Sequence, residues 1–228
     1  MNHFESDRSF YIKAMTMPTF RDTNPLLRPQ ERILETARAL FYSRGAGNVG
    51  IDLIIAESGV AKATLYKHFK SKDELIVAYM RQGDLRWLEW LQGAVSRLAP
   101  APENQLMAVW DALEEWFSLP LFRGCLLTNT VIELAQPEHL AGAVLLEHKE
   151  RVRGYLETLA VQAGVGNSRQ TSQIWMLLLE GATVTAARER TPDSAELARK
   201  LARDFLGQEV VTQPQTRVQM LEHLDFEF

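Results

Sequence analysis

The 228-residue sequence has little cysteine, glycine or proline: it holds one cysteine, Cys125, with 13 Gly and 9 Pro. One cysteine excludes an intrachain disulfide framework and a structural zinc site built on cysteines, and it favours a reducing compartment. The low glycine and proline content excludes a collagen-like or linker-like chain. A hydrophobic fraction of 46% excludes an intrinsically disordered chain. The composition therefore predicts a globular protein of one or two small domains.

Long hydrophobic runs are also missing. A membrane-spanning helix needs about 20 predominantly apolar residues, and apolar runs such as 174–179 are much shorter. Residues 1–13 mix acidic, basic and aromatic side chains, so they do not resemble a secretory signal with a basic start and an apolar core. We expect a cytoplasmic protein with no membrane partner.

Charge is unevenly distributed along the chain, although the total is only −4. Residues 28–81 hold nine Lys/Arg against six Asp/Glu, whereas residues 82–228 hold thirteen against twenty. A basic segment joined to an acidic body favours a local anion-binding face, such as one for nucleic acid. Chance is the alternative, because the basic excess is small.

The periodicity of apolar residues predicts an all-α protein of about nine helices, with no segment typical of a strand. Gly45 and Gly59 are placed to end the first two helices, and Ser71 and Glu74 match a capping box at the start of the fourth. The sequence 191–193, Thr-Pro-Asp, is a good start for the last. The expected helices span about residues 29–44, 51–58, 62–69, 71–98, 103–118, 121–135, 137–163, 168–190 and 192–207.

This order of elements predicts two domains between two tails. Three short helices with a glycine in the second turn match a helix-turn-helix domain at 26–80, with the helix-turn-helix itself at about 50–69. A larger helical bundle follows at 81–207. Residues 1–25 and 208–228 lack sustained periodicity, so we expect a disordered N-terminal tail and a C-terminal tail.

The third short helix has a surface suited to DNA. Val60, Leu65 and Phe69 supply its inward apolar groups, and its other faces carry no carboxylate. Lysine and tyrosine side chains there can reach phosphates or guanine edges, and the small Ala63 allows contact with a thymine methyl group. The residues of this surface are Lys62, Ala63, Thr64, Tyr66, Lys67 and His68. The alternative is a solvated face of an ordinary three-helix bundle.

The segment from Ile54 to Leu75, IIAESGVAKATLYKHFKSKDEL, resembles the DNA-binding domain of the TetR/AcrR family of bacterial transcriptional regulators. Its string G-V-x-x-x-x-L-Y-x-H-F-x-S-K-x-x-L is long and specific, and the resemblance covers about residues 28–80. The rest of the chain agrees with the family in length and all-α character. The resemblance implies a homodimer that places each third helix in a major groove of a palindromic DNA operator.

Family roles carry over only at matching positions. The residues that lie where the family touches DNA are Thr64, Tyr66, Lys67 and His68, and Lys72 lies where the family contacts phosphate. Lys72 also opens the fourth helix, where free N–H groups and the helix dipole favour a phosphate. Gly50 and Ala61 depart from the family pattern, because hydroxyl-bearing capping residues usually stand at these positions. We therefore expect no phosphate contact from Gly50.

A run of mostly small residues at 180–187 lies on one of the long helices and would allow a second helix to approach closely. The resemblance implies that helices 168–190 and 192–207 form a four-helix dimer interface. The predicted interface residues are Trp175, Leu178, Gly181, Ala182, Thr185, Leu197, Leu201 and Phe205. Packing of the same stripe within one chain is the alternative.

All five tryptophans lie in the larger domain, and the resemblance implies a pocket there for a small apolar effector. The candidate pocket residues are Trp87, Trp90, Trp110, Trp116, Phe122, Cys125, Tyr155 and Trp175. Ordinary core packing of the aromatic residues is the alternative.

The segment from Arg123 to Glu133 resembles one found in a group of TetR-type regulators, in some of which the cysteine senses electrophiles or oxidants. Arg123 or a helix N-terminus would lower the pKa of Cys125 and favour the reactive thiolate. The preferred hypothesis is instead a buried cysteine that acts as a small hydrophobic residue.

No H-E-x-x-H, Walker, GxSxG or GxGxxG string is present. The five histidines are scattered, and those adjacent to a glutamate cannot share a helix face with it. We expect no enzyme, no metal site and no cofactor. The sequence favours a homodimeric repressor that a small apolar effector releases from its operator; the alternative is an all-α ligand- or partner-binding module with decayed DNA recognition.

Overall fold

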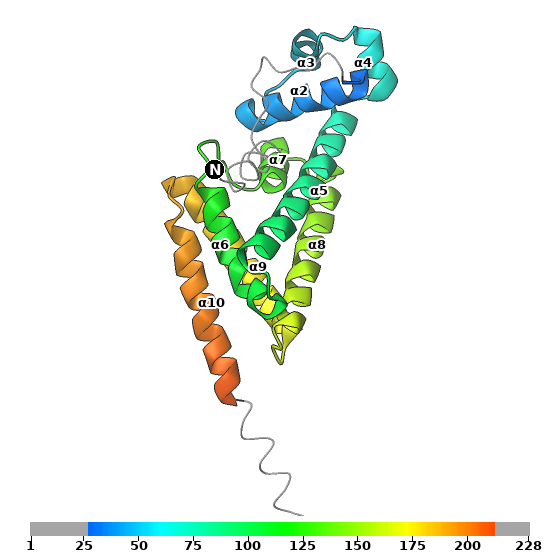
Figure 1. The fold of residues 1–228 in the computed structure, drawn as a ribbon. Helices are drawn as coiled ribbons and strands as arrows, with labels where there is room; N and C mark the ends of the chain where they lie inside the picture. The colour runs from blue at the N-terminus through cyan, green and yellow to red at the C-terminus, as the bar shows by residue number, and fades with distance from the viewer. Residues whose placement is uncertain (1–26, 213–228) are drawn as a thin grey trace, which may run out of the picture. The chain divides into compact units, whose positions relative to one another are not determined.

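The structure, a computed structural model, describes the backbone of residues 27–212 and the side chains of residues 27–207. Within that range the chain forms nine α-helices, one short 3-10 helix and no strand (Figure 1). The first helices are α2 (Pro29–Arg44), α3 (Ile51–Ser58), α4 (Lys62–His68) and α5 (Lys72–Leu98). The others are η1 (Pro102–Asn104), α6 (Gln105–Phe117), α7 (Leu126–Leu134), α8 (Ala141–Gln162), α9 (Ser168–Glu189) and α10 (Asp193–Thr212). The predicted all-α class is confirmed.

Three predicted helix boundaries differ from the structure by four or five residues, and one of them is the start of α8, at Ala141 rather than near residue 137. α7 begins at Leu126 rather than near residue 121, because the chain first makes a turn in which Phe122 N–H donates to Leu119 O (2.9 Å). Gly124 then takes a φ of 85°, which an α-helix does not allow. α10 continues to Thr212, five residues into the predicted C-terminal tail. The predicted N-terminal tail, 1–25, and the remainder of the C-terminal tail lie outside the described residues.

The chain divides into two compact units. One contains the described residues up to Gly93 together with Arg123–Arg151, and the other contains Ala94–Phe122 together with the described residues from Val152 on. α5 and α8 each pass from one unit into the other. The first unit therefore combines the three short N-terminal helices with α7 and the first part of α8, a grouping that the domain prediction did not anticipate.

The first unit has one continuous hydrophobic core. Ile33, Leu40 and Phe41 of α2 pack with Ile54, Leu65 and Phe69, and with α5 residues such as Tyr79. Phe41 and Tyr79 meet edge to face, with ring centroids 5.3 Å apart. Leu127 of α7 and Val144 of α8 belong to the same core. The short helices are therefore stabilised by tertiary burial, since helices of seven or eight residues are marginal by themselves.

Local signals fix where the short helices end and where α5 begins. Gly45 (φ 88°) and Gly59 (φ 63°) occupy positive-φ positions after α2 and α3, which favour glycine. Ser71 Oγ accepts from Glu74 N–H (3.0 Å) at the start of α5. Glu74 completes the cap by accepting from Lys70 N–H (2.7 Å) rather than from Ser71 itself.

The second unit is built on α6, α9 and α10, with α10 packed against both of the others. Trp175 of α9 is fully buried, and its Nε1–H donates to Leu106 O of α6 (3.1 Å). Small residues lie where α9 and α10 meet, and Ser194 Oγ donates to Ala182 O (2.8 Å). Alanine at such contacts lets two helices approach closely, so the small-residue run contributes to packing within the chain.

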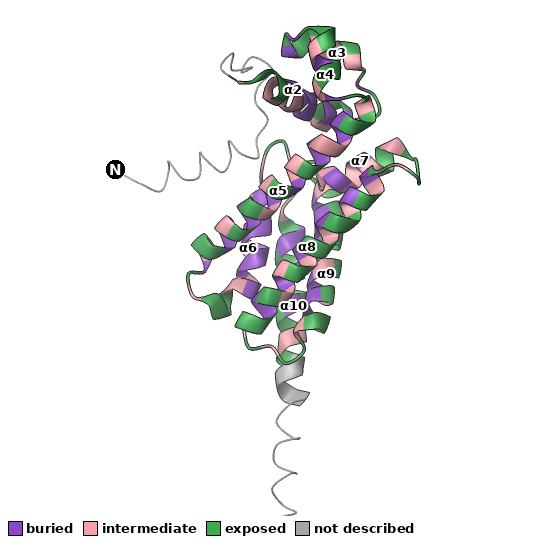
Figure 2. Cartoon of the chain, turned by 90° about the vertical axis from the view of Figure 1, so that its right-hand side faces the viewer, coloured by how far each residue is buried: buried purple, intermediate pink, exposed green. Residues whose placement is uncertain are grey.

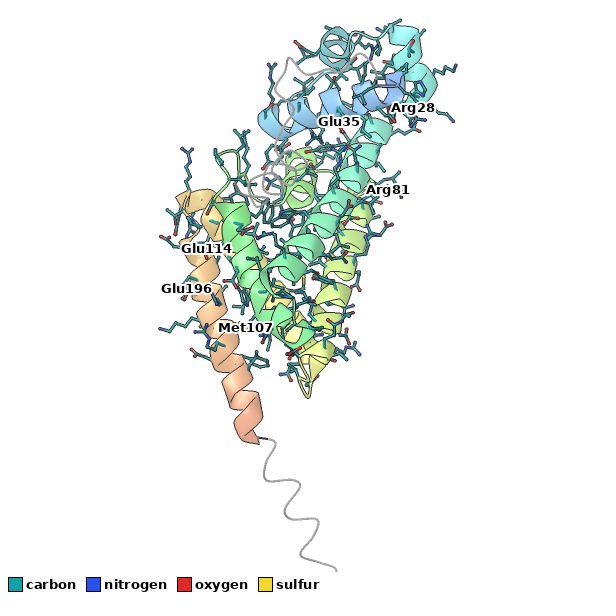
Figure 3. The ribbon with its side chains drawn as sticks, in the orientation of Figure 1. Arg28, Glu35, Arg81, Met107, Glu114 and Glu196 are labelled. Carbon is teal, nitrogen blue, oxygen red and sulfur yellow. The ribbon has the colours of Figure 1, made fainter. Side chains whose placement is uncertain are left out.

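Charged side chains join neighbouring helices inside each unit. Glu35 of α2, labelled in Figure 3, bonds Arg86 of α5 (2.5 Å) and Arg38 of its own helix (2.9 Å). In the second unit, Arg199 of α10 bonds Asp111 of α6 (2.6 Å). Among the described helices, none combines the length and low polarity that crossing a bilayer requires.

Candidate nucleic-acid interface

α4 presents an exposed face that carries cationic and hydroxyl-bearing side chains. Leu65 lies on the inward face and is fully buried, and Val60 and Phe69 at the two ends of the helix are buried with it. The predicted inward assignment is therefore confirmed. The exposed residues are Lys62, Ala63, Tyr66 and Lys67, whereas Thr64 and His68 are half-buried (Figure 2).

The positive charge of this face is largely available to a ligand. Lys62 faces Asp52 of α3 at 3.5 Å, but both side chains are mostly exposed, so this ion pair is weak. Within the part of the chain that the structure describes, Lys67 and Lys70 have no acidic partner within ion-pair distance. The face therefore favours an anionic partner.

Backbone geometry brings α4 close to α3. The αL conformation of Gly59 turns the chain tightly after α3, with its N–H donating to Ile55 O (3.1 Å). Gly50 and Ala61 occupy the N-cap positions of α3 and α4, and neither helix has a side-chain cap. These are the two positions at which the sequence departs from the family pattern. As a result, no N-cap side chain accepts a hydrogen bond from the first amide groups of α3.

Lys72 takes a different position from the other predicted DNA-contacting residues. Its Nζ donates to Gly47 O (3.2 Å) in the turn between α2 and α3. Desolvation lowers its pKa below the ordinary lysine value. The side chain is half-buried and helps to hold the turn, a role that the sequence prediction did not include.

Several of the predicted pocket residues form aromatic pairs within each unit. Trp87 and Trp90 lie in the first unit, with centroids 6.3 Å apart. The second unit contains one group around Trp110 and Trp175, with centroids 5.9 Å apart, and another around Trp116 and Phe122, at 5.0 Å. Tyr155 is half-buried in the second unit, and burial raises its pKa to about 12. The effector pocket remains a prediction.

Cys125 lies next to a buried cluster that the sequence did not reveal. His148 Nδ1 lies 2.7 Å from Asp84 Oδ1, and Arg151 bonds the other oxygen of the same carboxylate. Burial alone would raise the pKa of the Cys125 thiol. The hydrogen bond with His148, the charge of Lys149 and the hydrogen bonds with Thr128 together outweigh burial and lower the pKa to about 6.

The physical cause of this low pKa differs in part from the expected one. The bonds with Thr128 come from the first turn of α7, so the expected helix-terminus effect is present. The other groups that lower the pKa of Cys125 are His148 and Lys149, and not Arg123 as expected. In the described residues, no group of three or more His, Cys, Asp or Glu side chains is arranged to hold a metal ion.

The predicted dimer residues divide into buried and exposed sets. Trp175 and Ala182 are buried inside their own chain, and Leu178, Thr185 and Phe205 are half-buried. Gly181 is exposed, as are four apolar side chains of α9 and α10. These are Leu177 (75% exposed), Val184 (63%), Leu197 (60%) and Leu201 (48%). Sequence reasoning missed Leu177 and Val184, although their spacing around Gly181 places all three on one face of α9.

Comparison with known proteins agrees with this architecture. The sequence profile of bacterial regulatory proteins of the tetR family matches residues 33–79. An uncharacterized HTH-type transcriptional regulator of Mycobacterium tuberculosis is 28% identical over 83 residues, which are 36% of this chain and 41% of that protein. An HTH-type transcriptional regulator of Staphylococcus aureus is 41% identical over 56 residues, or 25% of this chain and 30% of that protein. These two alignments span less than half of each relative.

The solved structures extend the likeness to the whole fold. A TetR-family transcriptional regulator from Streptomyces coelicolor is 31% identical, with a TM-score of 0.70 over 79% of this chain and 95% of that one. A TetR-type regulator from Streptomyces avermitilis, at 24% identity, shares the fold with a TM-score of 0.64 over 78% of this chain and 99% of that one. The names of these relatives describe regulators and not enzymes. The chain belongs to the TetR family of bacterial transcriptional regulators.

Proposed function

We propose that the protein is a homodimeric repressor that binds a palindromic DNA operator and is released by a small apolar effector. The exposed face of α4, which carries Lys62, Tyr66 and Lys67 and no carboxylate, is the observation that carries this proposal. A helix of this kind enters the major groove, where lysine can bond guanine or phosphate and tyrosine can bond phosphate.

The exposed apolar residues of α9 and α10 support the dimer. Leu177, Val184, Leu197 and Leu201 would each be removed from water by a second copy of the same two helices. Burial of apolar surface contributes about 25 cal/mol per Å², and a two-fold interface uses each residue twice. Two copies of α4 would then read two half-sites of one operator.

Release by an effector requires different affinities for two states of the protein. A ligand shifts the dimer away from DNA only if it binds the released state more tightly than the DNA-bound state. The aromatic pairs that contain Trp87, Trp110 and Trp116 are the candidate places for such a ligand. Trp110 and Trp175 also form part of the core, so an effector bound there would alter the packing of α6, α9 and α10.

The direct test is selection of the purified protein against a pool of random duplexes at about 150 mM salt. We expect enrichment of a palindrome with half-sites about one helical turn of DNA apart. Binding should weaken steeply as salt is raised, because phosphate contacts release counterions. A folded dimer that enriches no sequence would instead favour a ligand- or partner-binding module with decayed DNA recognition.

A second candidate function concerns Cys125 as the site that receives the signal. Its low pKa and its hydrogen bond with His148 favour a thiolate that reacts with electrophiles by forming a carbon–sulfur bond. We expect iodoacetamide alkylation to accelerate with rising pH around a midpoint of about 6. The replacement His148→Gln should move that midpoint upward, because it removes the group that stabilises the thiolate.

The link from Cys125 to DNA binding is tested by Cys125→Ser. N-ethylmaleimide should release the wild-type protein from the selected duplex and should not release Cys125→Ser. Equal release of both proteins would exclude Cys125 as the sensor. An alkylation midpoint near 8.5, the ordinary range of a thiol, would show that the cysteine is a small hydrophobic residue without special reactivity.

A further inference from the structure

The segment from Arg123 to Glu133, which we call the arm, contacts the end of α2 and the turn that follows it. Arg123 N–H donates to the Tyr42 hydroxyl (3.1 Å), and Arg123 Nη1 donates to Ser43 O (2.9 Å). Glu133 Oε2 accepts from Ala46 N–H (2.8 Å). Two charged side chains of the arm thus hold backbone groups on both sides of Gly45.

These contacts satisfy backbone groups that α2 cannot satisfy itself. Ser43 O is among the last carbonyls of α2, which have no partner within the helix. The Ala46 amide lies in the turn, and Ala46 is almost completely buried. A buried amide without a partner is costly, so Glu133 stabilises this conformation of the turn although its own side chain is exposed.

Gly45 shows how closely the arm approaches the turn. A Cβ atom added at Gly45 would lie 2.9 Å from Glu133 Oε2, a distance that real Cβ atoms essentially never show. Gly45 also has a φ of 88° and a ψ of 139°, which side chains rarely adopt. The positive φ is the feature that favours glycine, and a side chain at this position would also displace the Glu133 carboxylate from the turn.

The turn in question sets the position of α3 and, through α3, of α4. Ala46 and Val49 lie in the same core as Ile54 and Leu65. Lys72 holds the turn at Gly47 O from the start of α5. A change in the turn would therefore be transmitted to the face of α4 through packed side chains.

The arm also has a hydrogen bond within itself and a packing contact with α5. Asn129 Nδ2 donates to Arg123 O (2.8 Å), which joins the start of the arm to α7. Leu126 lies against Gly83 of α5, where an added Cβ would be only 3.1 Å from it. Cys125 lies between Arg123 and Leu126 in the sequence of the arm. A ligand or modification that displaces the arm would therefore break or lengthen the hydrogen bonds that Arg123 and Glu133 make with the end of α2 and the turn.

We propose that Arg123 and Glu133 are positioning residues that couple the arm to the DNA-contacting helix. They act on the backbone around Gly45, and through α3 they set how α4 meets its operator. The coupling part of this inference rests on the proposed function, because it requires that α4 binds DNA. The holding of the turn does not depend on it.

The first measurement is hydrogen–deuterium exchange of the full-length protein without DNA. In Glu133→Ala, we expect amides of residues 44–58 to exchange about tenfold faster, the loss typical of one hydrogen bond to a charged group. Exchange in α9 and α10 should not change. Glu133→Gln should retain most of the protection, since its amide oxygen can still accept from Ala46. Glu89→Ala, at an exposed carboxylate of α5, is the matched control.

The second measurement tests coupling through its reciprocity. If the arm and α4 are coupled, binding of the selected duplex must stabilise the arm. We expect the duplex to slow exchange in residues 125–134 of the wild-type protein, but not in the double variant Arg123→Ala/Glu133→Ala. Residues of α4 should be protected by the duplex in both proteins.

The outcomes separate this inference from the proposed function. Unchanged exchange of residues 44–58 in Glu133→Ala would refute the holding of the turn, whether or not the protein binds DNA. Equal protection of the arm by the duplex in both proteins would refute the coupling. If the wild-type protein binds no duplex, the proposed function and the coupling both fail, and the measurement without DNA still decides the positioning role at the turn.

Discussion

The two exposed surfaces of this molecule that carry most of its proposed activity differ in chemistry. The face of α4 carries lysines and a tyrosine, and among the described residues the one ion pair on it is the weak Lys62–Asp52 pair. The faces of α9 and α10 carry exposed leucines and a valine. A cationic surface suits a polyanion and loses affinity in salt, whereas an apolar surface suits a second apolar surface and is largely insensitive to salt.

The difference also concerns how each surface is supported. α4 has seven residues and depends on one buried contact residue of its own, Leu65, together with its neighbours Val60 and Phe69. α9 and α10 have 22 and 20 residues, and both contain buried alanines, Ala182 and Ala186 in α9 and Ala195, Ala198 and Ala202 in α10. A short helix on a shared core is easier to move than two long helices packed on each other. The short helix is thus suited to a switchable contact and the long pair to a permanent one.

The largest expected effect comes from placing a charge in the apolar surface of α10. Leu201→Glu should convert the dimer to a monomer, because two carboxylates would be placed in the proposed two-fold interface. Operator affinity should fall by about 100-fold or more, since each monomer reads only one half-site. Sedimentation and duplex binding measure the two effects. Leu121→Glu changes another exposed leucine and should alter neither the dimer nor the operator affinity. If Leu201→Glu remains a dimer, the interface does not include this face of α10.

A smaller effect is expected from the cationic surface. Lys67→Ala should weaken operator binding about tenfold and reduce the slope of log affinity against log salt by about 1, if the side chain contacts one phosphate. The melting temperature should not change, because Lys67 is exposed and makes no ion pair within the described residues. Lys200→Ala on α10 is the control and should bind DNA normally. A large loss of stability in Lys67→Ala would contradict the outward orientation of this residue.

Sequence reasoning was most successful where the signals are local. The ends of α3 and α4 follow from Gly59, from the apolar spacing of Leu65 and Phe69, and from the cap at Ser71. Each of these interactions joins residues at most a few positions apart. The buried faces of the short helices were predicted for the same reason. Periodicity tells which side of a helix is apolar, and a buried side must be apolar.

The contacts that the sequence could not predict join residues far apart in the chain. Glu133 and Ala46 are separated by 87 positions, and His148 and Asp84 by 64. Neither pair has a spacing that a single helix would bring together. Trp175 was predicted both at the dimer interface and in the effector pocket; its indole is buried inside the chain against Trp110.

The smallest expected effect comes from Tyr66, where two substitutions distinguish the contribution of the hydroxyl group to operator affinity from that of the ring. Tyr66 is 43% exposed and lies beside Lys67 on the face that we propose enters the major groove. Tyr66→Phe removes one oxygen and keeps the ring, so operator affinity should fall about two- to fivefold, the loss expected for one neutral hydrogen bond. Tyr66→Ala should cost more, because the ring contact is lost as well. Duplex titrations on the two variants and on Tyr155→Phe, a control in the second unit, measure these differences. If Tyr66→Phe binds as well as wild type while Tyr66→Ala does not, the tyrosine contributes through its ring and the cationic face depends on its lysines alone for phosphate contact.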